Sequence, residues 1–143
     1  MNMEKIKASN SIFAQPVSSL ILHEEVVTCI KTETIYQVVN KMVASNIGSI
    51  IVVEDKKPVG IFTERDLMRK IIPKGVDVKT TTIEAVMTPN PVCIKPETPL
   101  IKIMAAMRLG KFRHLVIIDP EGLLVGVVSI KDTLNFITDH VYE

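Results

Sequence analysis

The 143-residue chain has no tryptophan, and aromatic residues make up only 4% of it. Stacking on aromatic rings is therefore not expected to dominate the binding of any flat ligand. Neither charge sign is in excess, because 17 lysines and arginines stand against 16 acidic residues. A chain with this balance has no strong field for holding a polyanion, so neither nucleic acid nor an anionic membrane is expected as a partner.

Long apolar runs are also missing. Runs such as 50–53 and 115–118 are far too short to cross a bilayer. The first ten residues are polar and mixed in charge, without the apolar stretch of a secretory signal. We therefore expect no membrane insertion and a cytoplasmic location. The 47% of apolar residues predicts a globular domain with a well-buried core.

Cysteine and histidine are too few and too scattered to indicate a metal site. Cys29 and Cys93 each lie inside a short apolar strand pattern, so we expect both to pack in the core rather than to form a disulfide. The histidines, which lack ligand spacing, are His23, His114 and His140. No zinc motif, glycine-rich phosphate loop or set of nucleophile and base occurs. We expect no catalysis and no required metal or cofactor.

What the chain does have is an internal repeat. Val59-Gly60-Ile61-Phe62-Thr63-Glu64-Arg65-Asp66 returns 66 residues later as Val125-Gly126-Val127-Val128-Ser129-Ile130-Lys131-Asp132. Upstream, Cys29-Ile30-Lys31 returns as Cys93-Ile94-Lys95 at an offset of 64. The offset changes in turns, as expected when two units keep one kind of core. Two copies at this long period indicate one compact module of two similar halves, not a solenoid.

Each copy predicts the order strand, helix, strand, strand, helix, because β-branched runs alternate with apolar residues at helical spacing. In the first copy the strands are expected at 27–30, 49–53 and 59–62, and the helices at 35–43 and 67–72. In the second copy the strands are expected at 92–94, 115–118 and 123–128, and the helices at 100–107 and 134–141. The predicted fold class is α/β (α+β), with two βαββα motifs.

Turn residues suggest the boundaries of these motifs. We predict an N-terminal extension over 1–16, a first motif over 17–72, a linker over 73–82 and a second motif over 83–143. Within the linker region, Thr81-Thr82-Ile83-Glu84 has the spacing of a capping box and predicts a short helix.

The main functional candidates lie where the third strand of each half meets its closing helix. Thr63 and Asp66, like Ser129 and Asp132, have the spacing of a capping box. An aspartate at a helix N-terminus can also take both hydroxyls of a ribose, beside free amide donors and a partial positive charge. Both interpretations stay open, and they are compatible, because a capping side chain could turn to a ligand when it arrives.

The two halves differ in charge next to a buried strand. Asn46-Ile47-Gly48-Ser49 in the first half corresponds to Lys111-Phe112-Arg113-His114 in the second. Arg113 could bind a phosphate through two parallel hydrogen bonds, and His114 adds a donor. Gly48 cannot do this, so the two potential sites should be unequal. Three further cations are candidates for phosphate contact or are simply solvated: Arg65, Lys111 and Lys131.

Together these features resemble the tandem CBS (cystathionine-β-synthase) domain pair, also called a Bateman module. The resemblance covers about residues 17–142. It rests on the paired signature of glycine, two variable residues, Thr or Ser, two variable residues and Asp, at Gly60 to Asp66 and at Gly126 to Asp132. Val86-Met87-Thr88-Pro89 and the run from Arg113 to Asp119 support it. The resemblance implies two βαββα motifs related by a pseudo-twofold axis and packed through their sheets.

The function implied by the resemblance is regulatory. Such modules bind AMP, ADP or ATP, and occasionally S-adenosylmethionine, in clefts between the two halves, and they control an attached or a separate partner protein. In this chain the partner would be separate, because no other domain is present. The predicted ligand-binding residues are Thr63, Asp66, Arg113, His114, Ser129, Lys131 and Asp132. In modules that resemble this one, the position of Arg113 and His114 contacts phosphate. Apolar walls for adenine would come from the first strands, through Thr28, Ile30, Val92 and Ile94.

Two further expectations concern assembly. The amphipathic helices at 35–43 and 100–107 carry more apolar surface than two small sheets can cover, and modules that resemble this one pair into a disc, so we expect a homodimer. The alternative to nucleotide binding is a ligand-independent dimerisation or docking module, in which the Thr/Asp and Ser/Asp pairs only cap helices. Thermal denaturation with and without nucleotide separates the two.

Overall fold

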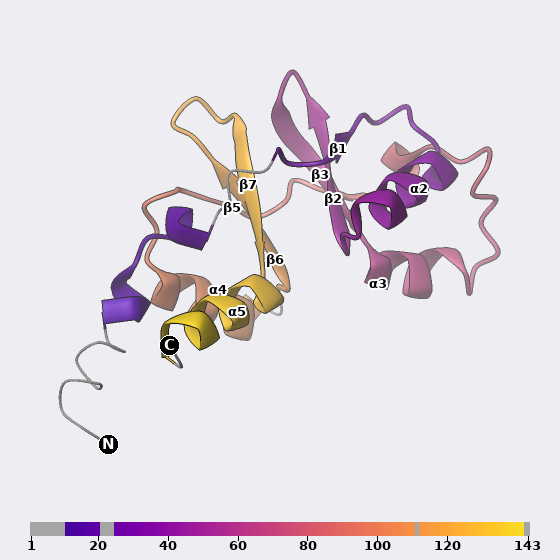
Figure 1. Cartoon of the computed structure of the whole chain (residues 1–143). Coiled ribbons are helices and arrows are strands. Elements are labelled where there is room, and N and C mark those ends of the chain that lie inside the picture. The colour runs from indigo at the N-terminus through magenta and orange to yellow at the C-terminus, as the bar shows by residue number, and fades with distance from the viewer. Residues whose placement is uncertain (1–10, 21–24, 111, 142–143) are drawn as a thin grey trace. The chain divides into compact units, whose positions relative to one another are not determined.

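The computed structural model describes residues 11–20, 25–110 and 112–141. The chain divides into two compact units (Figure 1), of which one contains Glu25–Pro91 and the other contains Met1–Glu24 and Val92–Glu143. We call these the first-repeat unit and the second-repeat unit. These units are defined by compactness and not by sequence motif, so the motif boundaries predicted from the sequence stay a prediction. Among the described residues, no helix combines the length and the hydrophobicity needed to cross a bilayer.

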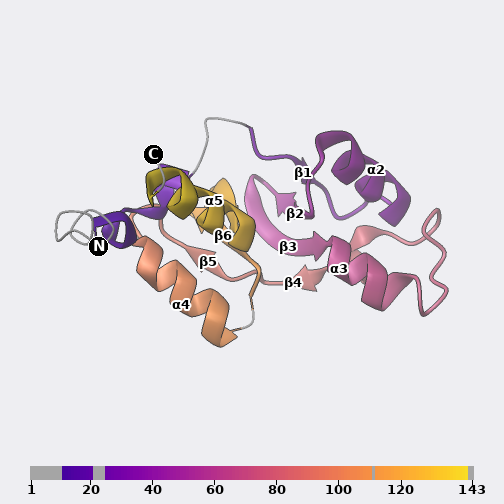
Figure 2. The same ribbon diagram turned by 60° about the horizontal axis from the view of Figure 1, so that its bottom comes forward.

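The first-repeat unit is built on a four-stranded sheet in the order β1-β2-β3-β4. Strand β1 (Thr28–Cys29) is parallel to β2 (Ser49–Glu54), which is antiparallel to β3 (Lys57–Thr63). Strand β4 (Thr88–Pro89) runs antiparallel along the other edge of β3 (Figure 2). Ile50, Ile51 and Val52 of β2 are fully buried, as the β-branched run predicts.

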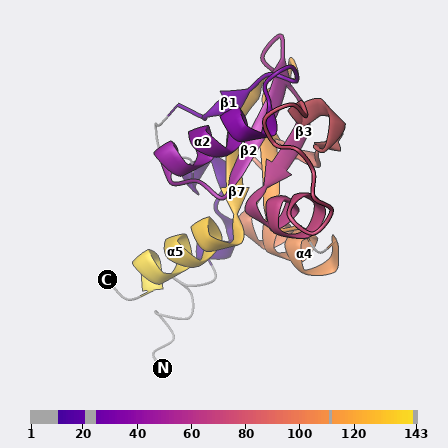
Figure 3. The ribbon, with the colours of Figure 1, turned by 90° about the vertical axis from the view of Figure 1, so that its right-hand side faces the viewer.

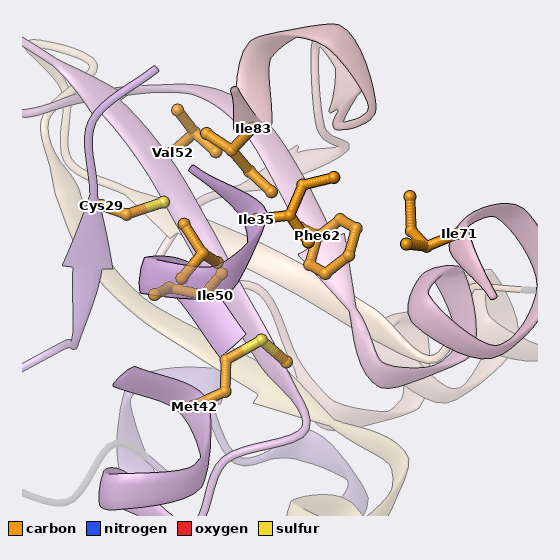
Figure 4. Packing of buried hydrophobic residues seen from close by; sticks show 9 residues of the cluster. Cys29, Ile35, Met42, Ile50, Val52, Phe62, Ile71 and Ile83 are labelled. Atoms are coloured by element: carbon orange, nitrogen blue, oxygen red, sulfur yellow. The ribbon is translucent and has the colours of Figure 1, made fainter. Parts of the chain in front are cut away.

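Three helical segments complete this unit. Helix α2 (Ile35–Ser45) begins with a capping box between Thr34 and Gln37 and ends at Asn46 in the left-handed conformation. Helix α3 (Glu64–Asp66) follows β3 directly and continues as a π-helical turn, η2 (Leu67–Ile71). A short 3-10 helix, η3, spans Ile83–Ala85. Their inner faces enclose the core shown in Figure 4, which consists of Cys29, Ile35, Val38, Met42, Ile50, Val52, Phe62, Ile71 and Ile83.

The second-repeat unit repeats this plan with three strands. Strand β5 (Cys93–Ile94) is parallel to β6 (His114–Ile118), which is antiparallel to β7 (Leu124–Ser129). Helix α4 (Leu100–Gly110) lies between β5 and β6 in the chain, and α5 (Ile130–Val141) leaves the end of β7 (Figure 3). The core consists of Val17, Ile103, Met107, Leu115, Ile117 and Val128. The βαββα order predicted for both copies is therefore confirmed.

One core residue of the second-repeat unit comes from the far end of the chain. Val17 begins the 3-10 helix η1 (Val17–Leu20) and is completely buried. Its amide donates to the carbonyl oxygen of Thr98 at 2.7 Å, and the amide of Leu100 donates to the carbonyl oxygen of Gln15 at 2.8 Å. Residues 15–18 thus supply both a core side chain and a backbone cap for α4.

The first-repeat unit uses residues 81–84 in the same way. The amide of Ile83 donates to the carbonyl oxygen of Glu33 at 2.8 Å, and that of Ile35 donates to Thr81 at 3.0 Å. Ile83 is completely buried, like Val17. In each repeat, therefore, a short segment outside the βαββα order adds a buried side chain and backbone hydrogen bonds. For the first repeat this segment is 81–84. For the second repeat it is 15–18, which precedes the first repeat in the chain.

The capping box predicted at Thr81-Thr82-Ile83-Glu84 is wrong. The short helix does form, but its N-cap is Thr82, and no side chain caps it. The reason is that the amide of Glu84, which a Thr81 hydroxyl would have bonded, already donates to the carbonyl oxygen of Lys31 at 3.3 Å. Backbone pairing has replaced the side-chain cap.

The two cysteines differ, although we expected both to be buried. Cys29 lies in the core, where burial, aided by the nearby Glu33 carboxylate, raises the pKa of its thiol to about 12. Cys93 is exposed, which corrects that expectation. Lys41 reaches over the edge of β1 to the carbonyl oxygen of Thr28 at 3.2 Å. Its counterpart in the repeat is Ala106, which is too short to cover β5 in this way.

Candidate functional site

Both signature aspartates cap the helix in which they lie. The amide of Thr63 donates to Oδ2 of Asp66 at 3.0 Å, and the amide of Asp66 donates back to Oγ1 of Thr63 at 3.2 Å. The corresponding distances for Ser129 and Asp132 are 2.8 and 3.1 Å. The hydroxyl of Ser129 also donates to Asp132 at 2.9 Å. The predicted capping role of the two Thr/Asp and Ser/Asp pairs is therefore confirmed.

Strand pairing brings Arg113 and His114 next to the second capping box. His114 stands opposite Ser129 in the β6–β7 register. The carbonyl oxygen of Arg113 accepts the amide of Ile130, the first residue of α5, at 3.0 Å. The backbone of Arg113 and His114 therefore lies next to the N-terminus of α5, where the Ser129 hydroxyl and the Asp132 carboxylate are located. The side chain of Arg113 is exposed, and that of His114 is half-buried. Four of the predicted ligand contacts are neighbours in one unit.

At the equivalent place in the first-repeat unit stands an acid. Gly48 accepts the amide of Glu64 at 2.9 Å, just as Arg113 accepts that of Ile130. A Cβ atom placed on Gly48 would lie 3.0 Å from Oε1 of Glu64 and 3.6 Å from Oε2. The Glu64 carboxylate therefore covers the position at which the other unit carries Arg113. The two sites were predicted to be unequal because the first-repeat unit lacks an arginine at this place. The structure shows a further difference, since the first-repeat unit carries a negative charge there.

The first-repeat unit also has an ion pair at its signature aspartate. Nζ of Lys70 lies 3.3 Å from Oδ1 of Asp66 and 3.4 Å from the hydroxyl oxygen of Thr88 on β4. Lys70 is not among the residues predicted from the sequence. The spacing of four residues between Asp66 and Lys70 on one helical face is the signal that could have found it.

Asp132 has different surroundings. The residue equivalent to Lys70 is Phe136, whose ring lies 4.1 Å from that of His140 between centroids. Asp132 itself is exposed, and in the described part of the chain no lysine, arginine or histidine forms an ion pair with it.

The remaining predicted cations are dispersed. Lys131 is exposed and Arg65 is half-buried, each within the first turn of its helix. Lys111 lies outside the described residues. Over the same described ranges, no group of three or more histidine, cysteine or acidic side chains is placed to hold a metal ion.

Of the four residues predicted to line a pocket for adenine, two have exposed side chains. The side chains of Ile30 and Val92 are 54% and 41% exposed, so both can offer apolar surface to a ligand, while Thr28 and Ile94 are half-buried. The backbone beside them is already in use. The amide of Ile30 donates to Oε2 of Glu33 at 2.8 Å, and the carbonyl oxygen of Val92 accepts the amide of Val116 at 3.1 Å.

Comparison with known proteins identifies the family. The family model described as the CBS domain matches the chain twice, over residues 17–73 and 83–139. The chain belongs to the CBS domain family. The two matches contain the two signatures, so the internal repeat is a pair of CBS motifs.

Relatives agree with this assignment. The mitochondrial CBS domain-containing protein CBSX3 of Arabidopsis thaliana is 35% identical over 112 residues, which cover 75% of this chain and 54% of CBSX3. The chain spans a smaller share, 18%, of several longer CBS domain-containing proteins of the same plant.

Solved structures share the CBS fold. A CBS-domain protein from Burkholderia ambifaria is 28% identical, with a TM-score of 0.81 over 87% of this chain and 95% of that one. The CBS domain protein PAE2072 from Pyrobaculum aerophilum, solved as a complex with AMP, is 27% identical, with a TM-score of 0.75 over 82% of this chain and 88% of that one. A CBS relative is thus known to bind AMP.

Proposed function

We propose that this CBS pair is a regulatory module that binds an adenosine nucleotide, AMP, ADP or ATP, and controls a separate protein. The observation that supports this most is the grouping of Arg113 and His114 beside Ser129 and Asp132. That grouping places a cation, a hydroxyl and an exposed carboxylate at the head of one helix. These are the groups that phosphate and ribose need.

The role of each residue follows from its chemistry. The Asp132 carboxylate would accept the ribose hydroxyls, after giving up part of its bonding to Ser129. Arg113 would hold the phosphate in two-pronged fashion, with His114 and Lys131 as further donors. In the second-repeat unit the exposed side chain of Val92 would pack on adenine, and in the first-repeat unit that of Ile30 would do so, since aromatic rings are scarce. In the first-repeat unit the corresponding hydroxyl and carboxylate are those of Thr63 and Asp66, and Arg65 would be the phosphate donor.

Calorimetric titration of the chain with adenosine, AMP, ADP, ATP and S-adenosylmethionine tests the proposal. Asp132→Asn should weaken nucleotide binding by about tenfold, because a hydrogen bond to a charged group is lost while an acceptor for the cap remains. Asp139→Asn is the matched control, since this exposed aspartate lies on the same helix. Absence of binding for every ligand would refute the proposal and favour the docking module.

We also propose that the chain forms a homodimer. The helices expose large apolar side chains, among them Val43 of α2, Leu109 of α4 and Leu134 of α5, which are 74%, 77% and 57% exposed. Apolar surface of this kind is typical of interfaces. Light scattering should give twice the chain mass, and Leu109→Lys should lower it if α4 lies in the interface. The absence of catalysis, the cytoplasmic location and the regulated partner expected from the sequence stay predictions.

A further inference from the structure

Asp66 and Asp132 hold equivalent positions in the two repeats, but within the described residues only Asp66 has a cation on its second carboxylate oxygen. In both, Oδ2 accepts the amide of the preceding hydroxyl residue. Oδ1 of Asp66 faces the ammonium of Lys70 at 3.3 Å. At Asp132 the equivalent of Lys70 is Phe136, which carries no charge. Asp132 instead accepts a second bond on Oδ2, from the Ser129 hydroxyl at 2.9 Å. The two repeats thus place the same residue beside a lysine in one case and beside a serine hydroxyl in the other.

Lys70 is held by contacts from two different elements. Besides Asp66 on its own helix, its ammonium contacts the hydroxyl of Thr88 at 3.4 Å. Thr88 belongs to β4, which pairs with β3 at Ile61. Two partners restrict the lysine more than a single surface ion pair would. The Asp66 side chain is only 15% exposed, so screening of its charge by water is reduced, whereas the Lys70 side chain is 48% exposed.

A ribose bound at a carboxylate needs both oxygens as acceptors, one for each hydroxyl. At Asp66 a ribose hydroxyl would have to share Oδ1 with Lys70 or displace the lysine from it. At Asp132 only a bond from the neutral Ser129 hydroxyl has to give way, since no ion pair joins this residue to a cation anywhere in the described ranges. The cost of separating Lys70 from Asp66 is therefore subtracted from binding in one repeat only.

We propose that Lys70 is an internal competitor for the carboxylate of Asp66, so that the first-repeat unit binds an adenosine ligand more weakly than the second-repeat unit. Lys70 is thereby a residue that sets the order in which the two repeats are occupied. This inference rests on the proposed nucleotide binding, and it names the side chain that regulates one of the two sites.

Adenosine is the probe that isolates this effect, because it has the ribose but no phosphate for Lys70 to attract. The amides of Thr63 and Ser129 donate to the two carboxylates, so their NMR signals report each repeat separately. Titration of the full chain should give a higher Kd at Thr63 than at Ser129. Lys70→Met should lower the Kd at Thr63 by about two- to threefold, the range for a helical ion pair, and leave that at Ser129 unchanged.

Two further variants make the test specific. Phe136→Lys introduces the competitor into the other repeat and should raise the Kd at Ser129 by about two- to threefold. Lys74→Met removes an exposed lysine from the turn after η2 and should change neither Kd. The same NMR spectra show whether each variant is folded.

The possible failures can be told apart. An unchanged Kd at Thr63 in Lys70→Met, with normal binding at Ser129, overturns the role of Lys70 and leaves nucleotide binding intact. A larger loss for AMP than for adenosine in Lys70→Met also overturns it, because the lysine is then a phosphate contact. If neither amide responds to adenosine or AMP in any variant, the proposed function fails, and this inference fails with it.

Discussion

The amide of Val17 donates a hydrogen bond of 2.7 Å to the carbonyl oxygen of Thr98, although the whole first-repeat unit lies between the two residues in the chain. With the bond between Leu100 and Gln15, it fixes residues 15–18 along the start of α4. The side chain of Val17 is completely buried among Ile103, Leu115 and the other core residues of the second-repeat unit. This unit therefore depends on residues that precede the first repeat.

Val17→Ala should destabilise the second-repeat unit by about 2 kcal/mol, because two buried methyl groups are lost and a cavity remains. Hydrogen exchange measured residue by residue should show faster exchange in β6 and β7, with β2 and β3 unaffected. Ser19→Ala, an exposed position in the same 3-10 helix, is the control and should change neither unit. Equal acceleration in both units would contradict the assignment of Val17 to one core.

Arg113→Ala should weaken AMP binding by about tenfold and adenosine binding much less, because only AMP carries the phosphate that the guanidinium would hold. Calorimetry with the two ligands gives the ratio. Arg108→Ala removes an exposed arginine from the last turn of α4 and serves as the control. Equal loss for both ligands would show that Arg113 does not contact the phosphate.

Gly60, the glycine of the first signature, leaves space that the side chain of Met87 occupies. A Cβ atom there would lie 2.3 Å from the sulfur of Met87 and 2.9 Å from its Cγ. Gly60→Ala should therefore destabilise the first-repeat unit by about 1–3 kcal/mol, as overpacked cores do. Urea denaturation of Gly60→Ala, Met87→Ala and the double variant forms a thermodynamic cycle. The double variant should lose less stability than the sum of the two single variants, and strict additivity would argue against the contact.

The helices and strands could be predicted because each depends on local periodicity. The apolar spacing from Ile35 onward marks the buried face of α2, and the β-branched run at Ile50 marks a strand buried in the core. The capping boxes at Asp66 and Asp132 are equally local. These features need no knowledge of which distant residues meet.

What the sequence did not reveal depends on contacts between elements. The cap predicted at Thr81 failed because the amide of Glu84 had found a backbone partner in Lys31, far away in the chain. Cys93 is exposed and Cys29 is buried, although the two strands look alike in sequence. The link from Lys70 to Thr88 required β4 to pair with β3. Spacing alone could suggest the Asp66–Lys70 pair but not the second partner that restricts the lysine.

Glu64 provides a prediction about the phosphate preference of the first repeat. Its carboxylate covers Gly48, the counterpart of Arg113, within the first turn of the helix that carries Asp66. A phosphate approaching this place would meet a negative charge instead of a guanidinium. Glu64→Gln should therefore lower the Kd for AMP at the first-repeat unit by about two- to threefold, the range for a partly solvated charge, while the Kd for adenosine stays the same.

The NMR titration monitored at the Thr63 amide measures this effect separately from binding in the other repeat. Glu84→Gln, an exposed glutamate of the same unit, removes the same charge at a different place and should leave both Kd values unchanged. The effect should shrink as salt is added, because repulsion between charges in water is screened. A Glu64→Gln variant that binds adenosine and AMP equally more tightly would indicate that Glu64 acts by blocking access to the site, and not through its charge.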